Sequence, residues 1–226
     1  MAKSVVRPGR GPQRVEEPLR RALVDLGSEA GLSGVTVSAL ARRSGIGRTT
    51  FYRYHGGVGA YVESVREQVL GELGEAFRAA QLEAGRDVGL YPILTARITA
   101  VLSVVEQRAD LLRLLWRDAD AVGFRHRVHL LLSGLLADDF EVLGARVDAA
   151  YCPPEYLLAF LSHAFVGAVT TWLAKSPREP IEDMTFYLAA LMSGSTAEFL
   201  QEGRAAVGSR LSGPPRLGRG GLSGSR

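Results

Sequence analysis

Cysteine, signal-like segments and long apolar runs are scarce in this chain of 226 residues. Its single cysteine, Cys152, excludes a framework of intrachain disulfides and fits a reducing compartment. Residues 1–18 are basic and contain no apolar run, so they do not have the character of a secretory signal. No stretch holds about 18 consecutive apolar residues, which predicts that no segment spans a membrane. We therefore expect a cytoplasmic protein.

The motifs of common catalytic and cofactor sites are also missing. There is no Gly-x-Ser-x-Gly elbow, no glycine loop that could cradle a phosphate and no His-Glu-x-x-His pair. His126 and His129 are spaced to share one face of a helix, which is a metal-binding arrangement. However, Arg125 and Arg127 flank them and would repel a cation, and no third ligand is evident. The sequence therefore predicts no enzyme, no metal site and no bound cofactor.

Charge is distributed unevenly along the chain. Residues 1–55 hold ten Lys/Arg against four Asp/Glu, residues 56–203 hold twelve against twenty, and residues 204–226 hold five arginines and no acid. A basic end on an acidic body suits a module that faces a polyanion, attached to a body that does not adhere to nucleic acid. Charges scattered without function are the alternative explanation.

Two short helices joined by a tight turn are predicted between Thr36 and Tyr54. Thr36 is a suitable N-cap for the first helix, and Gly45 can adopt the positive φ that ends it. The second helix starts near Gly47, with Phe51 directed inward and with arginine, threonine and tyrosine side chains directed outward. Such cations, hydroxyls and phenols contact phosphates and base edges. The segment is therefore predicted to be a helix-turn-helix whose second helix reads DNA.

This segment, TVSALARRSGIGRTTFYRYH from Thr36 to His55, resembles the DNA-binding signature of the tetracycline-repressor (TetR) family. Beyond the first part of the chain the resemblance extends only to length, helical pattern and a terminal pair of helices. The family usually has an aromatic residue at the position of His55 and a Ser-Lys pair at the positions of Gly57 and Val58. That lysine commonly holds a DNA phosphate. Here the cation is absent, and backbone N–H groups at the start of the next helix would have to hold the phosphate instead.

The resemblance and the apolar periodicity together predict an all-α fold, with an N-terminal three-helix DNA-binding unit and a C-terminal helical bundle for ligand binding and dimerisation. The first helix is expected to carry Pro18 in its first turn. The expected divisions are a disordered basic arm at 1–13, the helix-turn-helix domain at 14–57, the helical ligand-binding and dimerisation domain at 58–203, and a disordered basic tail at 204–226. Helices outside the motif are expected at 15–30, 58–84, 91–107, 109–116, 120–143, 155–175 and 181–201.

The expected DNA contacts lie in and just before the second helix of the motif. Arg48 and Thr49 are predicted to reach base edges, and Ser38, in the preceding helix, is a further base-reading candidate. The residues expected to hold phosphates are Thr36, Thr50, Tyr52, Arg53 and Tyr54.

In the TetR family the last two helices of each subunit form a four-helix dimer interface. The resemblance therefore implies a homodimer through 155–175 and 181–201, although packing within the monomer alone stays open. A dimer would set two reading helices about 34 Å apart, so the DNA operator is expected to be an inverted repeat. The resemblance also implies a ligand-responsive regulator, a repressor rather than an activator, released from DNA by a small and largely apolar effector.

The effector pocket is expected inside the helical bundle. Its candidate lining residues are aromatic and histidine side chains, each of which could instead be ordinary core: Tyr91, Trp116, Phe124, His126, His129, Phe160 and His163. Two other functions stay open. One is a DNA-binding regulator whose body docks a protein partner, and the other is a helical enzyme or binding module whose helix-turn-helix is vestigial.

Overall fold

The computed structural model describes residues 11–84, 90–118, 121–142 and 153–201, and within these ranges every regular element is helical. The all-α prediction is therefore confirmed. The helices are α1 (Gly11–Ala30), α2 (Val37–Ser44), α3 (Arg48–Tyr54), α4 (Val58–Ala84), α5 (Leu90–Gln107), α6 (Ala109–Arg117), α7 (Ala121–Val142), α8 (Pro154–Ala174) and α9 (Ile181–Gln201), with a short 3-10 turn, η1 (Leu32–Gly34), between α1 and α2.

The first helix departs from the prediction. It begins at Gly11 rather than near Val15, so residues 11–13 belong to α1 and not to the basic arm. Glycine and proline at the start of this segment suggested a break, but a proline in the first turn of a helix lacks only an N–H that would be unpaired anyway. Pro18 consequently lies inside α1 rather than in its first turn. The rest of the predicted arm and the tail at 204–226 lie outside the described residues.

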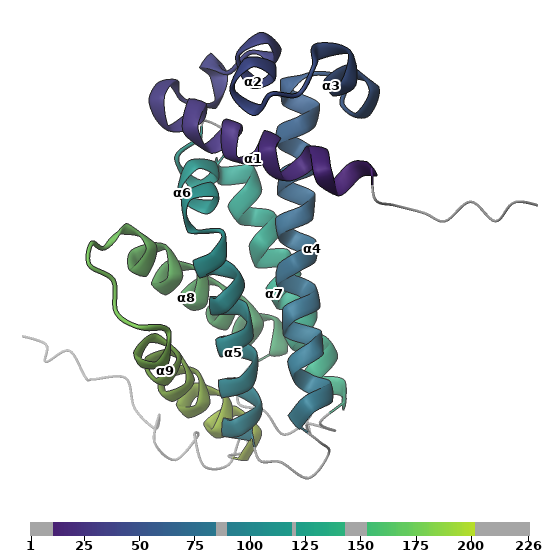
Figure 1. Cartoon of the computed structure of the whole chain (residues 1–226). Coiled ribbons are helices and arrows are strands. Elements are labelled where there is room, and N and C mark those ends of the chain that lie inside the picture. The colour runs from purple at the N-terminus through teal and green to yellow at the C-terminus, as the bar shows by residue number, and fades with distance from the viewer. Residues whose placement is uncertain (1–10, 85–89, 119–120, 143–152, 202–226) are drawn as a thin grey trace, which may run out of the picture.

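Figure 1 shows how the helices are arranged. Helices α1, α2 and α3 form a small unit at one end of the molecule, and α4 runs from that unit along the body beside α5 and α7. Helix α9 packs mainly on α5, and α8 packs mainly on α7, on the side of the body away from α4. The long helix α4 is therefore shared by the small unit and the body.

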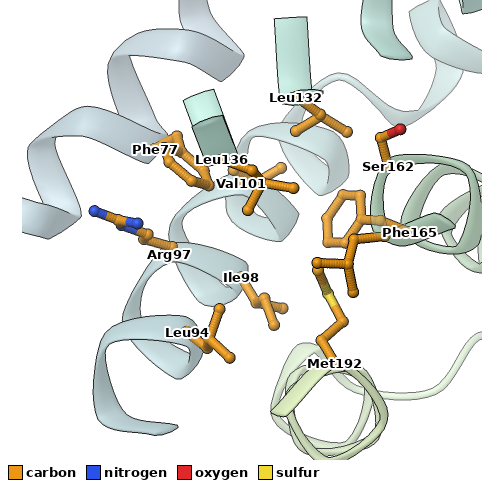
Figure 2. A pocket seen from close by; sticks show the side chains of 11 residues that line it. Phe77, Leu94, Arg97, Ile98, Val101, Leu132, Leu136, Ser162, Phe165 and Met192 are labelled. Carbon is orange, nitrogen blue, oxygen red and sulfur yellow. The ribbon is translucent and has the colours of Figure 1, made fainter. Parts of the chain in front are cut away.

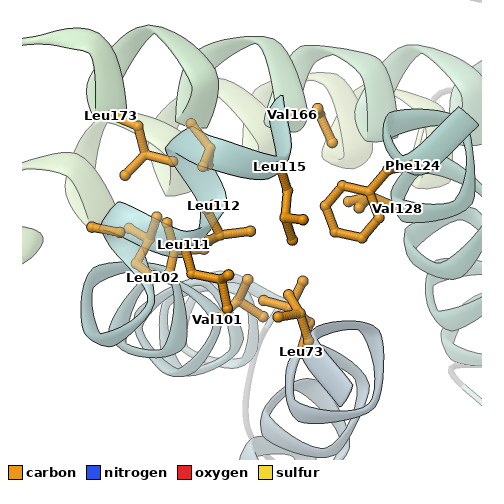
Figure 3. Close-up of a cluster of buried hydrophobic side chains, with 14 of the residues drawn as sticks. Leu73, Val101, Leu102, Leu111, Leu112, Leu115, Phe124, Val128, Val166 and Leu173 are labelled. Carbon is orange, nitrogen blue, oxygen red and sulfur yellow. The ribbon is translucent and has the colours of Figure 1, made fainter. Parts of the chain in front are cut away.

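The body is held together by apolar side chains from several helices. Leu102 of α5, Leu112 and Leu115 of α6 and Phe124 of α7 are at most 1% exposed. Figure 3 shows these side chains converging with Leu73 of α4. Burying a side chain of this size contributes about 1.5–3 kcal/mol relative to leaving it in water, so this cluster stabilises the bundle independently of any ligand.

Ion pairs add to the contacts between α4 and the rest of the body. Arg127 of α7 donates to two carboxylates of α4, those of Glu63 and Glu67. Further along α4, the Glu72 carboxylate accepts two hydrogen bonds from Arg108, at 2.9 and 3.0 Å. Two-pronged contacts between a guanidinium and a carboxylate fix orientation as well as distance, so they hold α4 in one rotational setting against α5, α6 and α7.

One helix of the body, α8, also has the length and hydropathy of a membrane span, with 21 residues and a mean hydropathy of 1.6. Composition alone does not distinguish such a helix from the core helix of a globular protein. In this structure α8 directs Leu157, Leu161, Phe165 and Trp172 into the core, where each is at most 7% exposed.

The small unit joins α4 through a cluster of three rings. Phe51 of α3 and Tyr61 of α4 are fully buried and meet edge to face, with ring centroids 5.9 Å apart. The His55 ring lies 5.3 Å from Phe51 and 4.6 Å from Tyr61, so histidine occupies the place that the TetR resemblance assigns to an aromatic residue. His55 Nε2 donates to the Glu16 carboxylate of α1 at 3.1 Å. One side chain thus connects α1, α3 and α4.

Replacing Glu16 by alanine should destabilise the protein by about 1–3 kcal/mol, because the part-buried His55 nitrogen would lose its acceptor. Glu17→Ala is the matched control. Among the described residues Glu17, itself 47% exposed, pairs with Arg21 and Arg20, and ion pairs of an exposed carboxylate contribute about 0–1 kcal/mol. Urea unfolding measures both. Equal losses for the two variants would show that the contact between His55 and Glu16 has no special role.

Candidate DNA-binding surface and ligand cavity

The turn between α2 and α3 is built by local hydrogen bonds. Thr36 Oγ1 accepts from the backbone N–H of Ala39 at 3.2 Å and caps α2, as predicted. At the other end, Gly45 has φ 72°, a left-handed conformation that favours glycine because a Cβ would be strained there. The Ser44 hydroxyl donates to the Leu40 carbonyl at 2.6 Å and accepts from the Ile46 N–H at 3.2 Å. These contacts fix the angle at which α3 leaves the turn.

Helix α3 buries one side chain and presents the rest. Phe51 is fully buried, whereas Arg48 and Thr49 at the start of the helix are exposed and Tyr52 is 52% exposed. The other proposed DNA contacts lie in the same small unit: Ser38, Thr36, Arg53 and Tyr54 are exposed, and Thr50 is half-buried. The structure therefore places all eight on α2, its N-cap and α3.

The arginines of this unit fall into two groups. Arg43 of α2 donates to Asp25 and Glu29 of α1, both at 3.2 Å, and hydrogen bonding to Glu29 raises its pKa further above its ordinary value. Within the described residues, by contrast, Arg48 and Arg53 form no ion pair, and the guanidinium of Arg53 lies 5.1 Å from the Tyr54 ring centroid. Arg43 thus contributes to the fold, while Arg48 and Arg53 can meet a polyanion without first breaking a salt bridge.

The residues proposed to line the ligand pocket are not brought together. Tyr91 and Phe160 are 42% and 58% exposed, and His126 and His163 are also exposed. Phe124 is 1% exposed and lies in the apolar cluster of Figure 3, so it is an ordinary core residue and not a pocket residue. Trp116 is half-buried and lines a void, and His129 stacks on His163. Aromatic character alone did not separate the side chains that face inward from those that face outward.

The apolar cavity of the body lies elsewhere, among α4, α5, α7, α8 and α9 (Figure 2). Its volume is about 20 Å³, which is room for about one water molecule. Apolar side chains such as Phe165 and Met192 form most of its wall, and Arg97 and Ser162 are the polar residues that line it. Sequence reasoning did not propose these residues. The available signal was Arg97, the only cation in α5.

His129 of α7 and His163 of α8 form a stacked pair outside this cavity. Their ring centroids are 3.8 Å apart and the rings are inclined by 14°. The His163 Nδ1–H donates to the Ala159 carbonyl at 2.8 Å, and His129 Nδ1 is buried with no hydrogen-bond partner among the described residues. Burial, and then the charge of His163, lower the pKa of His129 below its ordinary value of 6.5. Among the described residues no group of three potential metal ligands is found.

Comparison with known proteins defines the class of this molecule. Residues 94–194 match the model of a TetR-type transcriptional regulator C-terminal region. No curated protein matches the chain in sequence at a significant level. Together with the helix-turn-helix at the N-terminal end, the matched region makes the chain a DNA-binding transcriptional regulator. Over residues 94–194 the chain is similar to the TetR family.

Solved structures share the fold at low sequence identity. The fatty acid degradation regulator FadR from Bacillus halodurans is 15% identical, with 83% of this chain and 97% of that chain covered and a TM-score of 0.61. The regulator FadR from Bacillus subtilis, solved in complex with stearoyl-CoA, is 14% identical over 79% of this chain and 98% of that chain, with a TM-score of 0.59. A TetR-like transcriptional regulator from Rhodococcus sp. RHA1 is 18% identical, with 84% and 99% covered and a TM-score of 0.58.

Two substitutions should separate base reading from phosphate binding. Arg48→Ala is expected to relax specificity at one or two base pairs, by about 1–3 kcal/mol if the contact to guanine is bidentate. Tyr52→Phe should weaken binding on all DNA sequences alike, because it removes only a donor to phosphate. Arg78→Ala, an exposed arginine far along α4, is the control. Equal losses for Arg48→Ala on operator and random DNA, measured by fluorescence anisotropy, would assign Arg48 to phosphate binding instead.

The stacked histidines should make stability depend on pH. Because the folded state lowers the pKa of His129, the unfolded chain binds a proton first as pH falls below about 6.5. The neutral ring therefore contributes to the stability of the folded state above that pH, and this contribution is lost on acidification. The denaturant midpoint should decrease less between pH 7 and pH 5 for His129→Phe than for the natural chain. The exposed His126→Gln should behave like the natural chain, and an unchanged pH dependence in His129→Phe would contradict the assignment.

Proposed function

We propose that this regulator is a homodimeric repressor that binds an inverted-repeat operator in the cytoplasm and is released by a small, largely apolar effector. The DNA-binding part of this proposal is supported by the exposed surface of α3. There Arg48, Thr49 and Tyr52 project from a helix that the buried Phe51 anchors. Recognition helices of this kind lie in the major groove with their N-terminal residues at base edges.

The dimer is supported by apolar side chains on the outer faces of α8 and α9. Tyr156 and Phe160 of α8 are 66% and 58% exposed, and Phe186 and Leu191 of α9 are 60% and 71% exposed. A Cβ added to Gly167, on the same face of α8, would meet nothing within 4 Å, so a second helix could approach closely there. Exposed apolar patches of this kind mark interaction sites, and two-fold dimers are the most common soluble oligomers.

Response to a ligand is supported by the position of the apolar cavity. It touches α4 at Phe77, and α4 continues into the DNA-binding unit. A ligand that enlarges the cavity would therefore act on the helix that carries α3. The Bacillus subtilis FadR, which shares this fold, was solved with an apolar-chain ligand, stearoyl-CoA, in line with an effector of that character here.

A second candidate is a DNA-binding regulator whose body docks a protein partner rather than a small molecule. The small volume of the cavity, about 20 Å³, favours it, because no effector fits without movement of the surrounding side chains. Increased thermal stability in the presence of an apolar small molecule would support the first candidate over the second.

Selection of bound fragments from a random DNA pool tests the proposed function. The expected result is an inverted repeat whose half-site centres lie about 34 Å apart, one turn of B-DNA. A single half-site, or no enrichment at low salt, would contradict the proposal.

Substitution of the exposed apolar face tests the dimer. Phe160→Glu and Leu191→Glu should convert the protein to monomers in light scattering, because a carboxylate placed at the centre of an apolar interface leaves an unpaired buried charge. Operator affinity should fall as the dimer is lost. Val122→Glu, at an equally exposed apolar side chain on α7, is the matched control and should leave the dimer intact. A natural chain that is monomeric at micromolar concentration would contradict the proposed interface.

A further inference from the structure

The DNA-binding unit touches the body at a second place besides α4. Helix α6 lies beside α1, as Figure 1 shows, and the two helices are in contact. Gly27, near the end of α1, is buried there, and Leu114 of α6 is 7% exposed. A Cβ added to Gly27 would lie 2.7 and 2.9 Å from the two methyl carbons of Leu114 and 3.3 Å from its Cγ. The backbone of α1 and a side chain of α6 therefore meet with no room for a further carbon.

We propose that the contact between Gly27 and Leu114 positions the DNA-binding unit on the body and thereby sets the half-site spacing that the dimer accepts. The inference rests on the proposed homodimer and inverted-repeat operator, and it adds two residues that determine which operators are bound. Both residues act through the orientation of α3 and not by contact with DNA.

The glycine at position 27 is explained by the close approach of α6 and not by the conformation of the backbone. Gly27 lies inside α1, and among the described residues positive φ angles occur only at Gly31 and Gly45. Glycine is less favourable than alanine inside a helix, so the helix alone gives no reason for it. At Gly71, inside α4, an added Cβ would meet nothing within 4 Å. The missing side chain at Gly27 thus makes room for Leu114.

The contact between α1 and α6 is narrow and apolar. Within the described residues, hydrogen bonds join α1 to α2, to α4 and to the residue that ends α3, and none joins it to α6. Two open grooves, of about 630 and 440 Å³, adjoin the contact. Gly27 and Leu114 line the first, and Val24 and Leu111, one turn earlier in each helix, line the second. Because open space borders the contact, the fit of Gly27 against Leu114 determines how closely the two helices approach.

Helix α1 meets α4 and α6 at separate points along its length. The Arg20 guanidinium donates to Gln68 of α4 at 3.1 Å, and Gly27 meets Leu114 two turns later, about 10 Å along the helix. Two separate supports fix an angle that α4 alone would leave free to change. Ordinary carbon contacts of about 3.5–4.0 Å would require a shift of about 1 Å at an alanine in position 27, which is a tilt of α1 by about 6°.

Such a tilt matters because two DNA-binding units must fit one operator. Hydrogen bonds to base edges weaken steeply when their distances and angles change. In a symmetric dimer both units tilt together, so the distance between the two α3 helices changes as well. The preferred separation of the half-sites therefore depends on the contact between α1 and α6.

The opposite side of α6 faces the interior of the body. Leu112 and Trp116 line a second void of about 20 Å³, together with Leu73 of α4. Helix α6 thus lies between this void and α1. A molecule that widened the void would act on both supports of the DNA-binding unit, α4 and α6.

Gly27→Ala in the full-length protein tests this proposal. The probes are three labelled duplexes: the inverted repeat selected from random DNA, the same repeat with one base pair added between its half-sites, and a single half-site. In fluorescence anisotropy Gly27→Ala should bind the selected repeat about tenfold more weakly and prefer it less over the lengthened repeat, with unchanged affinity for the half-site. Gly71→Ala is the matched control and should bind all three duplexes as the natural chain does.

Leu114→Val in the Gly27→Ala background provides the rescue. It removes one carbon where Gly27→Ala adds one, and changes that conserve the total volume are tolerated best. The double variant should recover the preference for the selected repeat. Leu114→Val alone should loosen the contact and lower that preference, which keeps the proposal testable if Gly27→Ala does not fold.

Two results would overturn the proposal. An unchanged preference in both single variants would show that the Leu114 side chain turns into the groove and leaves the helices in place. Equal losses on the half-site and on the selected repeat would show that the contact stabilises the DNA-binding unit instead of orienting it. A natural chain that prefers no inverted repeat would instead contradict the proposed function.

Discussion

The structure depends on the double attachment of α4. At its first turns, Tyr61 is fully buried against Phe51 and His55, and without this contact α3 would have little to pack on. A unit of three short helices buries too little surface to be stable alone. Further along, the carboxylates of Glu63 and Glu72 are held by arginines of the body. The helix that completes the DNA-binding unit is therefore also a structural member of the bundle.

This arrangement connects the body to the helix-turn-helix unit through one helix. Phe77 and Leu73 of α4 each line one of the two voids, so any molecule that widens them displaces the same helix that positions α3. A rigid helix transmits such a displacement because its ion pairs and buried rings restrict rotation about its own axis. Only a modest difference in affinity is needed. A ligand that prefers one setting of α4 by 100-fold shifts the equilibrium by about 2.7 kcal/mol.

The sequence was sufficient to predict the fold and the position of the helix-turn-helix. Helix periodicity located α4 through α9, and the helix-turn-helix motif is encoded by local signals: the hydroxyl cap at Thr36, the glycine at Gly45 and one inward-facing aromatic, Phe51. The start of α1 could not be predicted, because a glycine and a proline that end one helix can equally begin another. A helix boundary can be predicted from the sequence only where residues next to it in the chain fix the backbone conformation.

The apolar cavity could not be predicted, for a related reason. Helix α8 is apolar around most of its circumference, so its sequence does not reveal that Phe165 faces the bundle while Phe160 faces outward. That choice is made by the neighbouring helices, which supply the opposite side of each contact. The same holds for Arg97, whose burial depends on Phe77 in another helix.

Hydrogen exchange of the full-length protein with and without its selected operator tests the central claim most directly. Operator should slow exchange at α2, α3 and the first turns of α4, because the DNA-facing surface and the helix that supports it are ordered together. The exposed faces of α7 should exchange as in the free protein. Unchanged exchange over residues 36–60, with protection on another surface of the body, would contradict the account.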